Sequence, residues 1–412
     1  MPNTITNKKI IFAIIVAALG YFVDAYDIVI FSVIRIASLK SLGLTGDEIT
    51  TMGAFLINCQ LIGMILGGVG WGILGDKLGR LQVLFGSIAL YSLANFANAY
   101  VSSIDQYALC RFFGGIGLAG EVGAGITLVS ELMSKEKRGY GTMLVAFVGL
   151  YGVSVAGLVG DQFTWQTAYI TGGIMGLVLL MLRISVAESG MFQTARQEED
   201  VKRGDLRLLL GSWKRLGRYI CCILTVSTLW MYLTIFVTFA PEIGRVLGIA
   251  DAVKSGQAMF YVGIAFAVGS LVAGFISQKI RSRKKVLHGG IIGFCLIGFI
   301  LLSKITTTPP IYYAIFSLMG FSGGYWSVFL SLVTEQFGTN IRATVTTSVP
   351  NFMRALGILH TTLFIALKPL VGVIPAIEII LGSFTLISLT ALWFLRETFG
   401  IDLNFVESDA RD

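Results

Sequence analysis

The sequence predicts an all-α membrane protein with twelve transmembrane helices in two similar bundles of six. Two observations support this prediction. The 412 residues are 55% hydrophobic and only 13% charged, with a mean hydropathy of +0.79, whereas soluble domains carry about twice that charged fraction. The apolar residues also gather in runs of about 20 or more, the length that a helix needs to cross the hydrocarbon core of a bilayer.

Twelve apolar runs follow one another along the chain. They lie near residues 10–36, 51–74, 82–101, 106–133, 140–160, 166–186, 218–240, 256–278, 286–303, 311–334, 343–367 and 372–395. The longest polar gap separates the sixth run from the seventh. We therefore predict an N-terminal six-helix bundle over residues 1–190, a cytoplasmic linker over 191–217 and a C-terminal six-helix bundle over 218–412.

The positive charges predict the orientation. Most of the 31 Lys and Arg residues fall in loops on the side of the N-terminus. The opposite loops hold Arg35, Lys40, Arg245, Lys254, Lys304 and Lys368. Because Lys and Arg accumulate in cytoplasmic loops, both termini are expected in the cytoplasm. The net charge of +7 reflects this asymmetry and the anionic inner leaflet, so no nucleic-acid partner is expected.

Several other classes of protein are not favoured. The five cysteines lie in apolar segments without zinc-site spacing, so neither a metal site nor a disulfide framework is expected. No nucleophile–base pair or phosphate-binding loop appears, so we expect no cofactor and no enzyme activity. The chain has no N-x-S/T sequon. This absence and the compact length favour a bacterial inner membrane, and a monomer is expected.

Three motifs occur twice, in the same order, in the two halves. A Glu is followed seven residues later by an Arg in 131–138 and again in 335–342. The segments AES (187–189) and RET (396–398) form a second pair, and GILGDKLGR (72–80) resembles GFISQKIRSR (274–283). Such internal repeats are typical of secondary transporters.

These motifs resemble those of the major facilitator superfamily over the whole length of the chain. GILGDKLGR is similar to the signature loop between spans 2 and 3. RFFGGIGLAGE (111–121) and RETFG (396–400) resemble the branch that holds sugar porters, organic-ion transporters and metabolite:proton symporters, and DAYD (24–27) resembles the span-1 motif of aromatic-acid and metabolite proton symporters. Two residues depart from the family pattern: Ala187 stands in place of Pro, and Gln278 stands in place of Asp in the second copy of the signature loop. The C-terminal part of the gate is therefore expected to be weaker.

Two carboxylates in span 1 are candidates for proton coupling. Asp24 and Asp27 are three residues apart and share a helix face. A carboxylate at mid-membrane costs at least about 2.5–3.5 kcal/mol, so its presence points to function. The resemblance implies that Asp27 works with Arg111 of span 4, with Asp24 as the next choice. Helix rise places Asp27 and Arg111 in the outer half of the bilayer. The alternative is a carboxylate satisfied by a neighbouring span.

Two further charged residues lie deep in spans. Glu121 follows several glycines, which we interpret as a close helix-packing seam, and it is a second candidate for a proton or substrate site. Arg354 lies near the midplane in span 11, where the resemblance implies contact with an anionic substrate. The alternative is an ion pair between Arg354 and an acid such as Glu121. His360 is interpreted as a packing residue.

Polar-tipped side chains in the same spans are candidates for lining a substrate cavity, and a ring-bearing substrate would stack on several of them. With Arg354, these candidates are Asn58, Gln60, Trp230, Tyr232, Tyr261, Tyr325, Trp326 and Asn351. Most aromatic residues in membrane proteins serve packing instead.

Alternating charges on the cytoplasmic side predict a gate. Its members are Asp76, Arg80, Glu131, Arg138 and Glu188 in one half, with Glu335, Arg342 and Glu397 in the other. Singly, exposed pairs contribute about 0–1 kcal/mol, but a network can bias two conformations that differ by a few kcal/mol.

The favoured function is secondary active transport: uptake of a small organic anion, with an organic carboxylate favoured, by proton symport through alternating access. The partners expected are this small molecule, protons and the lipid bilayer. Two alternatives remain open. One is a proton-coupled exporter of drugs or metallophores on the same fold. The other is a passive uniporter or a non-transporting membrane sensor, against which the buried acids argue.

Overall fold

The computed structural model describes residues 7–78, 80–121, 138–188, 209, 211–303, 305–401, 405 and 407. Its helices, in order, are α1 (Asn7–Ser41), α2 (Asp47–Leu78), α3 (Arg80–Asn98), α4 (Ile104–Leu118), α6 (Arg138–Gln162), α7 (Trp165–Glu188), α9 (Trp213–Thr225), η2 (Tyr232–Val237), α10 (Ala240–Val246), α11 (Ser255–Ile280), α12 (Arg283–Leu301), α13 (Pro309–Gly323), α14 (Trp326–Gln336), α15 (Thr339–Val371) and α16 (Val373–Phe394).

These elements account for the twelve predicted spans in order. Within the described residues, nine helical segments are long and apolar enough to cross a membrane, with α13 and α14 together forming one of them. The other three spans correspond to α3, to α4, and to the interrupted series α9–η2–α10. Proline at the first turn of α13 and a Ser103 cap on α4 explain where these helices begin.

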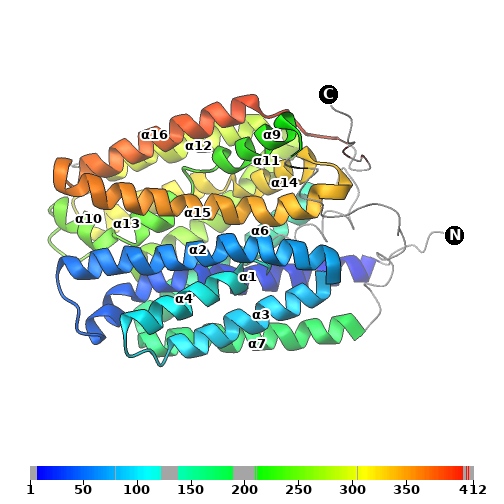
Figure 1. Cartoon of the computed structure of the whole chain (residues 1–412). Coiled ribbons are helices and arrows are strands. Elements are labelled where there is room, and N and C mark those ends of the chain that lie inside the picture. The colour runs from blue at the N-terminus through cyan, green and yellow to red at the C-terminus, as the bar shows by residue number, and fades with distance from the viewer. Residues whose placement is uncertain are drawn as a thin grey trace.

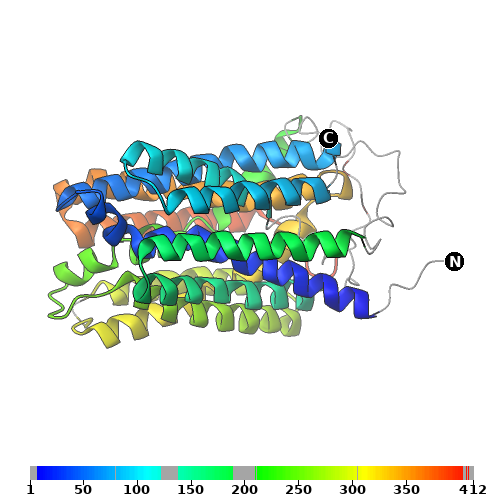
Figure 2. The same ribbon diagram turned by 90° about the horizontal axis from the view of Figure 1, so that it is seen from below.

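The helices lie side by side along a common direction, and the two halves of the chain form two layers in Figure 1. Helices α1, α2, α3, α4 and α7 lie in the lower part of that view and α9, α12, α14, α15 and α16 in the upper part, with α6 between them. Helix α6 packs on α11, and α2 packs on α15, which joins the halves. Figures 1 and 2 show that α1 begins, and α16 ends, at the same end of the bundle. We call it the terminal end, and the opposite one the distal end. Most of the predicted linker, residues 191–217, lies outside the described residues, so these domain limits stay a prediction.

Span 7 is broken, where the sequence predicts one continuous helix. Helix α9 ends at Thr225, and after several turns the chain forms the π-helix η2 and then α10, which has a proline in its first turn. The Thr234 and Thr238 hydroxyls donate to backbone carbonyls four and five residues earlier, and such bonds compete with the regular helical ladder. Irregular backbone at membrane depth is tolerated where it lines a cavity.

The glycines of α4 act as a packing seam, as predicted. A Cβ on Gly117 would lie 2.6 Å from the backbone nitrogen of Tyr91 on α3, and one on Gly115 would collide with the Gln60 carbonyl on α2. The absence of side chains at these positions lets α4 approach α2 and α3 closely. This packing fixes the position of Gln60 and of Arg111, one turn before the seam.

Candidate functional site

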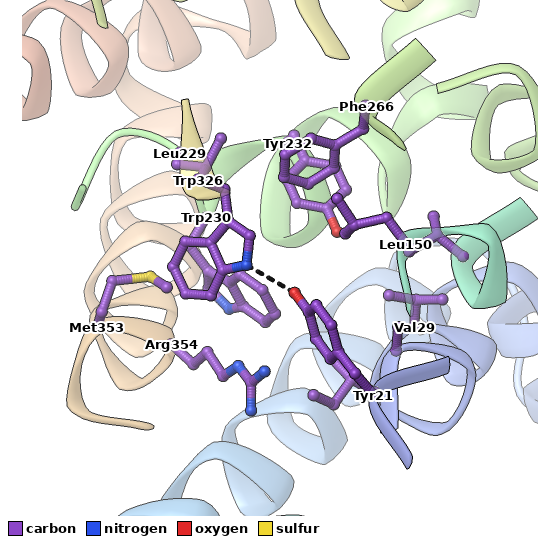
Figure 3. Close-up of a pocket in the computed structure, with 13 residues that line it drawn as sticks. Tyr21, Val29, Leu150, Leu229, Trp230, Tyr232, Phe266, Trp326, Met353 and Arg354 are labelled. Carbon is purple, nitrogen blue, oxygen red and sulfur yellow. Dashed lines mark hydrogen bonds between the residues drawn. The ribbon is translucent and has the colours of Figure 1, made fainter. Parts of the chain in front are cut away.

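A cavity lies between the two halves of the bundle, lined by residues of both. Five aromatic side chains line it, and Figure 3 shows them around a common space: Tyr21, Trp230, Tyr232, Phe266 and Trp326. Arg354 of α15 is the only charged residue among the described residues that line it. An apolar, aromatic cavity with a single cation suits a small molecule that carries a ring and one negative charge.

A hydrogen bond crosses this cavity between the halves. Trp326 Nε1 on α14 donates to the Tyr21 hydroxyl on α1 at 2.6 Å, the dashed line in Figure 3. Trp326, Trp230 and Tyr232 were predicted from the sequence as lining candidates, whereas Tyr21 and Phe266 were not. Since the bond joins elements of both halves, a movement of one half against the other must change this wall of the cavity.

Arg354 is held by a buried ion pair. Its Nη2 lies 3.2 Å from Asp24 Oδ2, and both side chains are buried. The guanidinium also lies 5.7 Å from the centre of the Trp230 ring, and its Nη1 donates to Asn351 Oδ1 at 3.4 Å. Arg354 Nε and Asp24 Oδ1 have no hydrogen-bond partner within the described residues. The alternative considered for Arg354, an ion pair with an acid of the protein, is thus formed in the structure, but the acid is Asp24 of the facing helix α1 and not the suggested Glu121.

Asp27 is buried without an ion-pair partner in the part of the chain that the structure describes. Neither carboxylate oxygen makes a hydrogen bond there, and the side chain is only 1% exposed. Gly172 of α7 makes room for it, because a Cβ at that position would meet Asp27 Oδ1 and lie 3.0 Å from Asn95 Nδ2. A direct ion pair of Asp27 with Arg111 is thus not formed in this structure.

Arg111 is bonded to an amide instead. Its Nη2 donates to Gln60 Oε1 on α2, and its guanidinium lies 5.0 Å from the Phe31 ring centre and 5.9 Å from that of Tyr169. The rings and the amide contact a cation that is 2% exposed, while its Nε has no hydrogen-bond partner within the described residues. The roles of Asp27 and Arg111 in coupling stay predictions.

Glu121 forms a separate buried pair with Arg183 of α7. Arg183 Nη1 donates to Glu121 Oε2 at 3.2 Å, and Nη2 contacts Oε1. A Cβ on Gly20 of α1 would collide with both groups, so the pair lies against the helix that carries Asp24. Sequence reasoning missed Arg183 because it lies near the predicted end of span 6, among charges that were assigned to the loops.

The remaining polar candidates are distributed differently. Gln60 lines a second cavity, described below. Asn351 donates to the Ala119 and Thr347 carbonyls, both at 2.9 Å, and Asn58 accepts from Thr361 at 2.8 Å, so both are contacts between the halves. Tyr325 is buried outside the cavity lining.

Two other candidates serve packing. Tyr261 is wrong as a lining residue: it is 47% exposed and its ring lies 5.7 Å from that of Tyr313, because it points away from the interface between the halves. His360 packs edge-on against Phe384, with ring centres 4.3 Å apart, in line with its interpretation as a packing residue.

Charged contacts join the two halves at the distal end. Arg35 is fully buried, pairs with Glu242 of α10 at 2.8 Å and donates to the Thr238 carbonyl at 2.7 Å. Lys368 pairs with Asp47 at 3.0 Å, at a more exposed position. The sequence placed Arg35 in a distal loop, whereas the structure places it inside α1, in contact with the second half.

Breaking the Arg35–Glu242 pair should favour conformations open at the distal end. We expect Glu242→Gln to increase the labelling of Ser32→Cys, a buried α1 position, several-fold by a membrane-impermeant thiol reagent, in a variant that lacks the five native cysteines. Lys368→Gln is the matched control, since an exposed pair contributes little. Labelling that does not change in Glu242→Gln would show that this pair does not hold the distal end closed.

The terminal end carries the predicted gate residues, of which three have described side chains. Glu335 pairs with Arg283 at 3.1 Å, and Arg342 Nε donates to the Thr334 and Phe337 carbonyls. Asp76, Arg80, Arg138 and Glu188 lie on helices, but their side chains are outside the described ones, and Glu131 lies outside the described residues.

The third of these residues, Glu397, accepts from the Arg283 amide at 2.9 Å, at the start of α12. Burial raises the pKa of Glu397, but hydrogen bonds from Ser282 and from the amides of Arg283, Lys284 and Phe399 outweigh this effect and lower it overall. Glu397 is therefore an anion fixed at a helix N-terminus.

The family of the chain follows from a comparison with known sequences. The family model described as Major Facilitator Superfamily matches residues 17–361. The chain belongs to the major facilitator superfamily. It is thus an integral, multi-pass membrane protein and a transporter rather than an enzyme, as the sequence predicts. Its fold agrees with the proton:xylose symporter XylE bound to 6-bromo-6-deoxy-D-glucose, with a TM-score of 0.74, 19% identity and coverage of 97% of this chain and 98% of that one.

Relatives within the superfamily are similar over most of the chain. The niacin transporter NiaP of Acinetobacter baylyi (strain ATCC 33305 / BD413 / ADP1) is 28% identical over 361 residues, 80% of each chain. The 3-(3-hydroxy-phenyl)propionate transporter of Escherichia coli (strain K12) is 25% identical over 299 residues, 70% of this chain and 71% of the relative.

Proposed function

We propose that this transporter takes up a small organic carboxylate by proton symport across a bacterial inner membrane, with both termini in the cytoplasm. The observation that carries the proposal is the Arg354–Asp24 pair at the edge of an aromatic cavity between the two halves. Arg354 supplies the charge that an anion needs, and Asp24 supplies an acid that can exchange a proton when the pair opens.

The cavity supports an anion with a ring or a conjugated system. Within the described residues, five aromatic side chains line it around a single guanidinium, so a ring can stack on its walls while an acid group meets Arg354. A guanidinium offers a planar fork of donors that matches a carboxylate. Niacin and 3-(3-hydroxyphenyl)propionate, named for two relatives, each combine one carboxylate with one aromatic ring.

The pairing of Arg354 with Asp24 couples substrate to protons. A substrate carboxylate that binds Arg354 competes with Asp24 for the same guanidinium. The displaced Asp24 would then be a buried charge without a cation, which is costly unless it takes up a proton. Substrate and proton therefore enter together. Asp27 lies one helical turn away and is a second site where a proton can reside without disturbing an ion pair.

Transport in oriented proteoliposomes tests the proposal. A thermal-shift screen of carboxylates first identifies a ligand, because a bound ligand stabilises the folded state. A symporter should then move protons with that substrate in the same direction, as reported by a pH-sensitive dye inside the vesicles. Proton movement in the opposite direction would indicate an exporter, and substrate movement without protons would indicate a uniporter; either result would reject the proposal.

We also propose that the repeated charges at the terminal end close the cytoplasmic side. Replacing Asp76 or Arg138 with Ala should weaken that closure and raise the labelling of cysteines placed in the cytoplasmic part of the cavity by about two-fold or more, since a lost pair of about 0–1 kcal/mol changes a two-state population by a few-fold at most. The same substitution at Asp251, in a distal loop, is the control. Labelling unchanged by both gate substitutions would count against this role.

A further inference from the structure

A second cavity adjoins the first. It shares Ile28 and Trp230 with the lining of the central cavity. Its other lining residues include Gln60, Ser32 and Thr234. Because Trp230 lines both cavities and lies against Arg354, groups on the wall of the second cavity adjoin the space in which a ligand of Arg354 would bind.

The orientation of the Gln60 amide is fixed by chemistry. Arg111 donates to Gln60 through Nη2, and a guanidinium has only donors, so the amide must present its oxygen to Arg111. The amide nitrogen Nε2 then carries two N–H donors, and it has no hydrogen-bond partner within the described residues. Gln60 is 4% exposed, so these donors are buried at the cavity wall.

Trp230 supplies another such donor. Its Nε1 lacks a hydrogen-bond partner in the described part of the chain, and its side chain is 7% exposed. An indole N–H can only donate. Two side chains that line the second cavity therefore carry donors without acceptors. A buried donor without an acceptor destabilises the protein, and a ligand that supplies an acceptor would remove this cost.

We propose that Gln60, oriented by Arg111, and Trp230 form a subsite for a hydrogen-bond acceptor at the end of the substrate remote from its carboxylate. This inference rests on the proposed carboxylate transport and narrows it. The substrate class is a ring-bearing carboxylate with a ring nitrogen, carbonyl or hydroxyl oxygen away from the acid. Arg111 acts as a positioning residue, because it sets which face of the Gln60 amide meets the cavity.

Nearly isosteric probes can test the subsite. Benzoate and the two pyridine carboxylates, nicotinate and isonicotinate, differ in one ring position, which is C–H in the first and an acceptor nitrogen in the others. We expect at least one pyridine carboxylate to bind the purified wild type roughly ten- to a hundred-fold more tightly than benzoate, measured by calorimetry. Without donors in the site the preference should reverse, since the ring nitrogen would lose its water without a replacement.

The decisive variant is Gln60→Glu. It keeps an acceptor for Arg111 and nearly the same shape but removes both N–H donors. The added carboxylate acts on all three anionic probes alike, so the measured quantity is the ratio of pyridine carboxylate affinity to benzoate affinity, which we expect to fall at least ten-fold. Gln60→Leu should lower the preference similarly, and melting temperatures show whether either variant is misfolded. Met64→Leu changes the same cavity wall without removing a donor and should keep the preference.

The outcomes separate the two proposals. Equal binding of all three probes to the wild type, or an unchanged preference in Gln60→Glu, would overturn the subsite and leave carboxylate transport standing. Failure of every probe to bind the wild type would overturn the proposed substrate class, and the subsite with it. Weaker binding of all three probes in Arg354→Lys, by roughly ten- to a hundred-fold, with the pyridine preference lost only in Gln60→Glu, would support both.

Discussion

Replacing Arg354 with Lys is expected to weaken the binding of an organic carboxylate roughly ten- to a hundred-fold. The variant keeps the positive charge next to Asp24 but loses the planar fork of donors that can hold a carboxylate with two bonds. Losing a charge-assisted hydrogen bond costs about 1.5–3 kcal/mol, which corresponds to this change in affinity. Titration calorimetry with the ligand found by thermal shift, on wild type and variant, measures the effect.

A purely structural role for Arg354 makes a different prediction. Arg354→Ala leaves Asp24 as a buried charge without a cation, and breaking a buried pair in this way destabilises a fold by about 3–5 kcal/mol. Adding Asp24→Asn should then restore much of the melting temperature. If Arg354→Lys lowers the melting temperature but leaves affinity unchanged, Arg354 only holds Asp24, and the case for an anionic substrate is lost.

The spans were predictable because a backbone segment in lipid has no water to hydrogen-bond with. A segment that crosses the hydrocarbon must satisfy its own hydrogen bonds, so long apolar runs become helices whatever their detailed order. The break in span 7 was not predictable in the same way. The Thr234 and Thr238 side chains that bond to the backbone there are also common in regular membrane helices, and Pro241 lies at the end of the run, where it marks a helix start as readily as a kink.

The charged residues of the site were predictable, but their partners were not. Arg354 stands out as a cation in an apolar run, and the helix rise per residue places it near the midplane of the bilayer. Depth does not say which way a helix is rotated or which neighbour it faces. The sequence therefore offered Glu121 as the partner of Arg354, whereas the packing of α1 against the second half brings Asp24 to it and leaves Glu121 with Arg183.

The aromatic lining of the cavity could be predicted only in part for the same reason, because the sequence does not show which face of a helix points inward. Tyr21 and Phe266 line it, and Tyr261 does not, although all three lie in similar apolar runs. In a membrane helix, lipid and a cavity both accept aromatic rings, so hydrophobic periodicity carries little information on which face points inward.

Asp27→Asn is expected to abolish proton-driven accumulation of the substrate while exchange of labelled for unlabelled substrate across the membrane continues. Asp27 is buried and forms no ion pair within the described residues, so the amide breaks no salt bridge there. What the substitution removes is a group that can bind and release a proton. The melting temperature should therefore stay near that of the wild type.

Asp24→Asn is the comparison that separates an effect on coupling from an effect on substrate binding. Asp24→Asn leaves Arg354 without its acid and should alter substrate binding as well as coupling, whereas Asp27→Asn should alter coupling alone. Asp105→Asn, the same chemical change in the first turn of α4 at the distal end, should affect neither. Accumulation and exchange are measured in proteoliposomes with a pH gradient, inside alkaline. Normal accumulation in both the Asp27→Asn and Asp24→Asn variants would remove the proton role from this face of α1, because no other acid lies on it between Gly20 and Phe31.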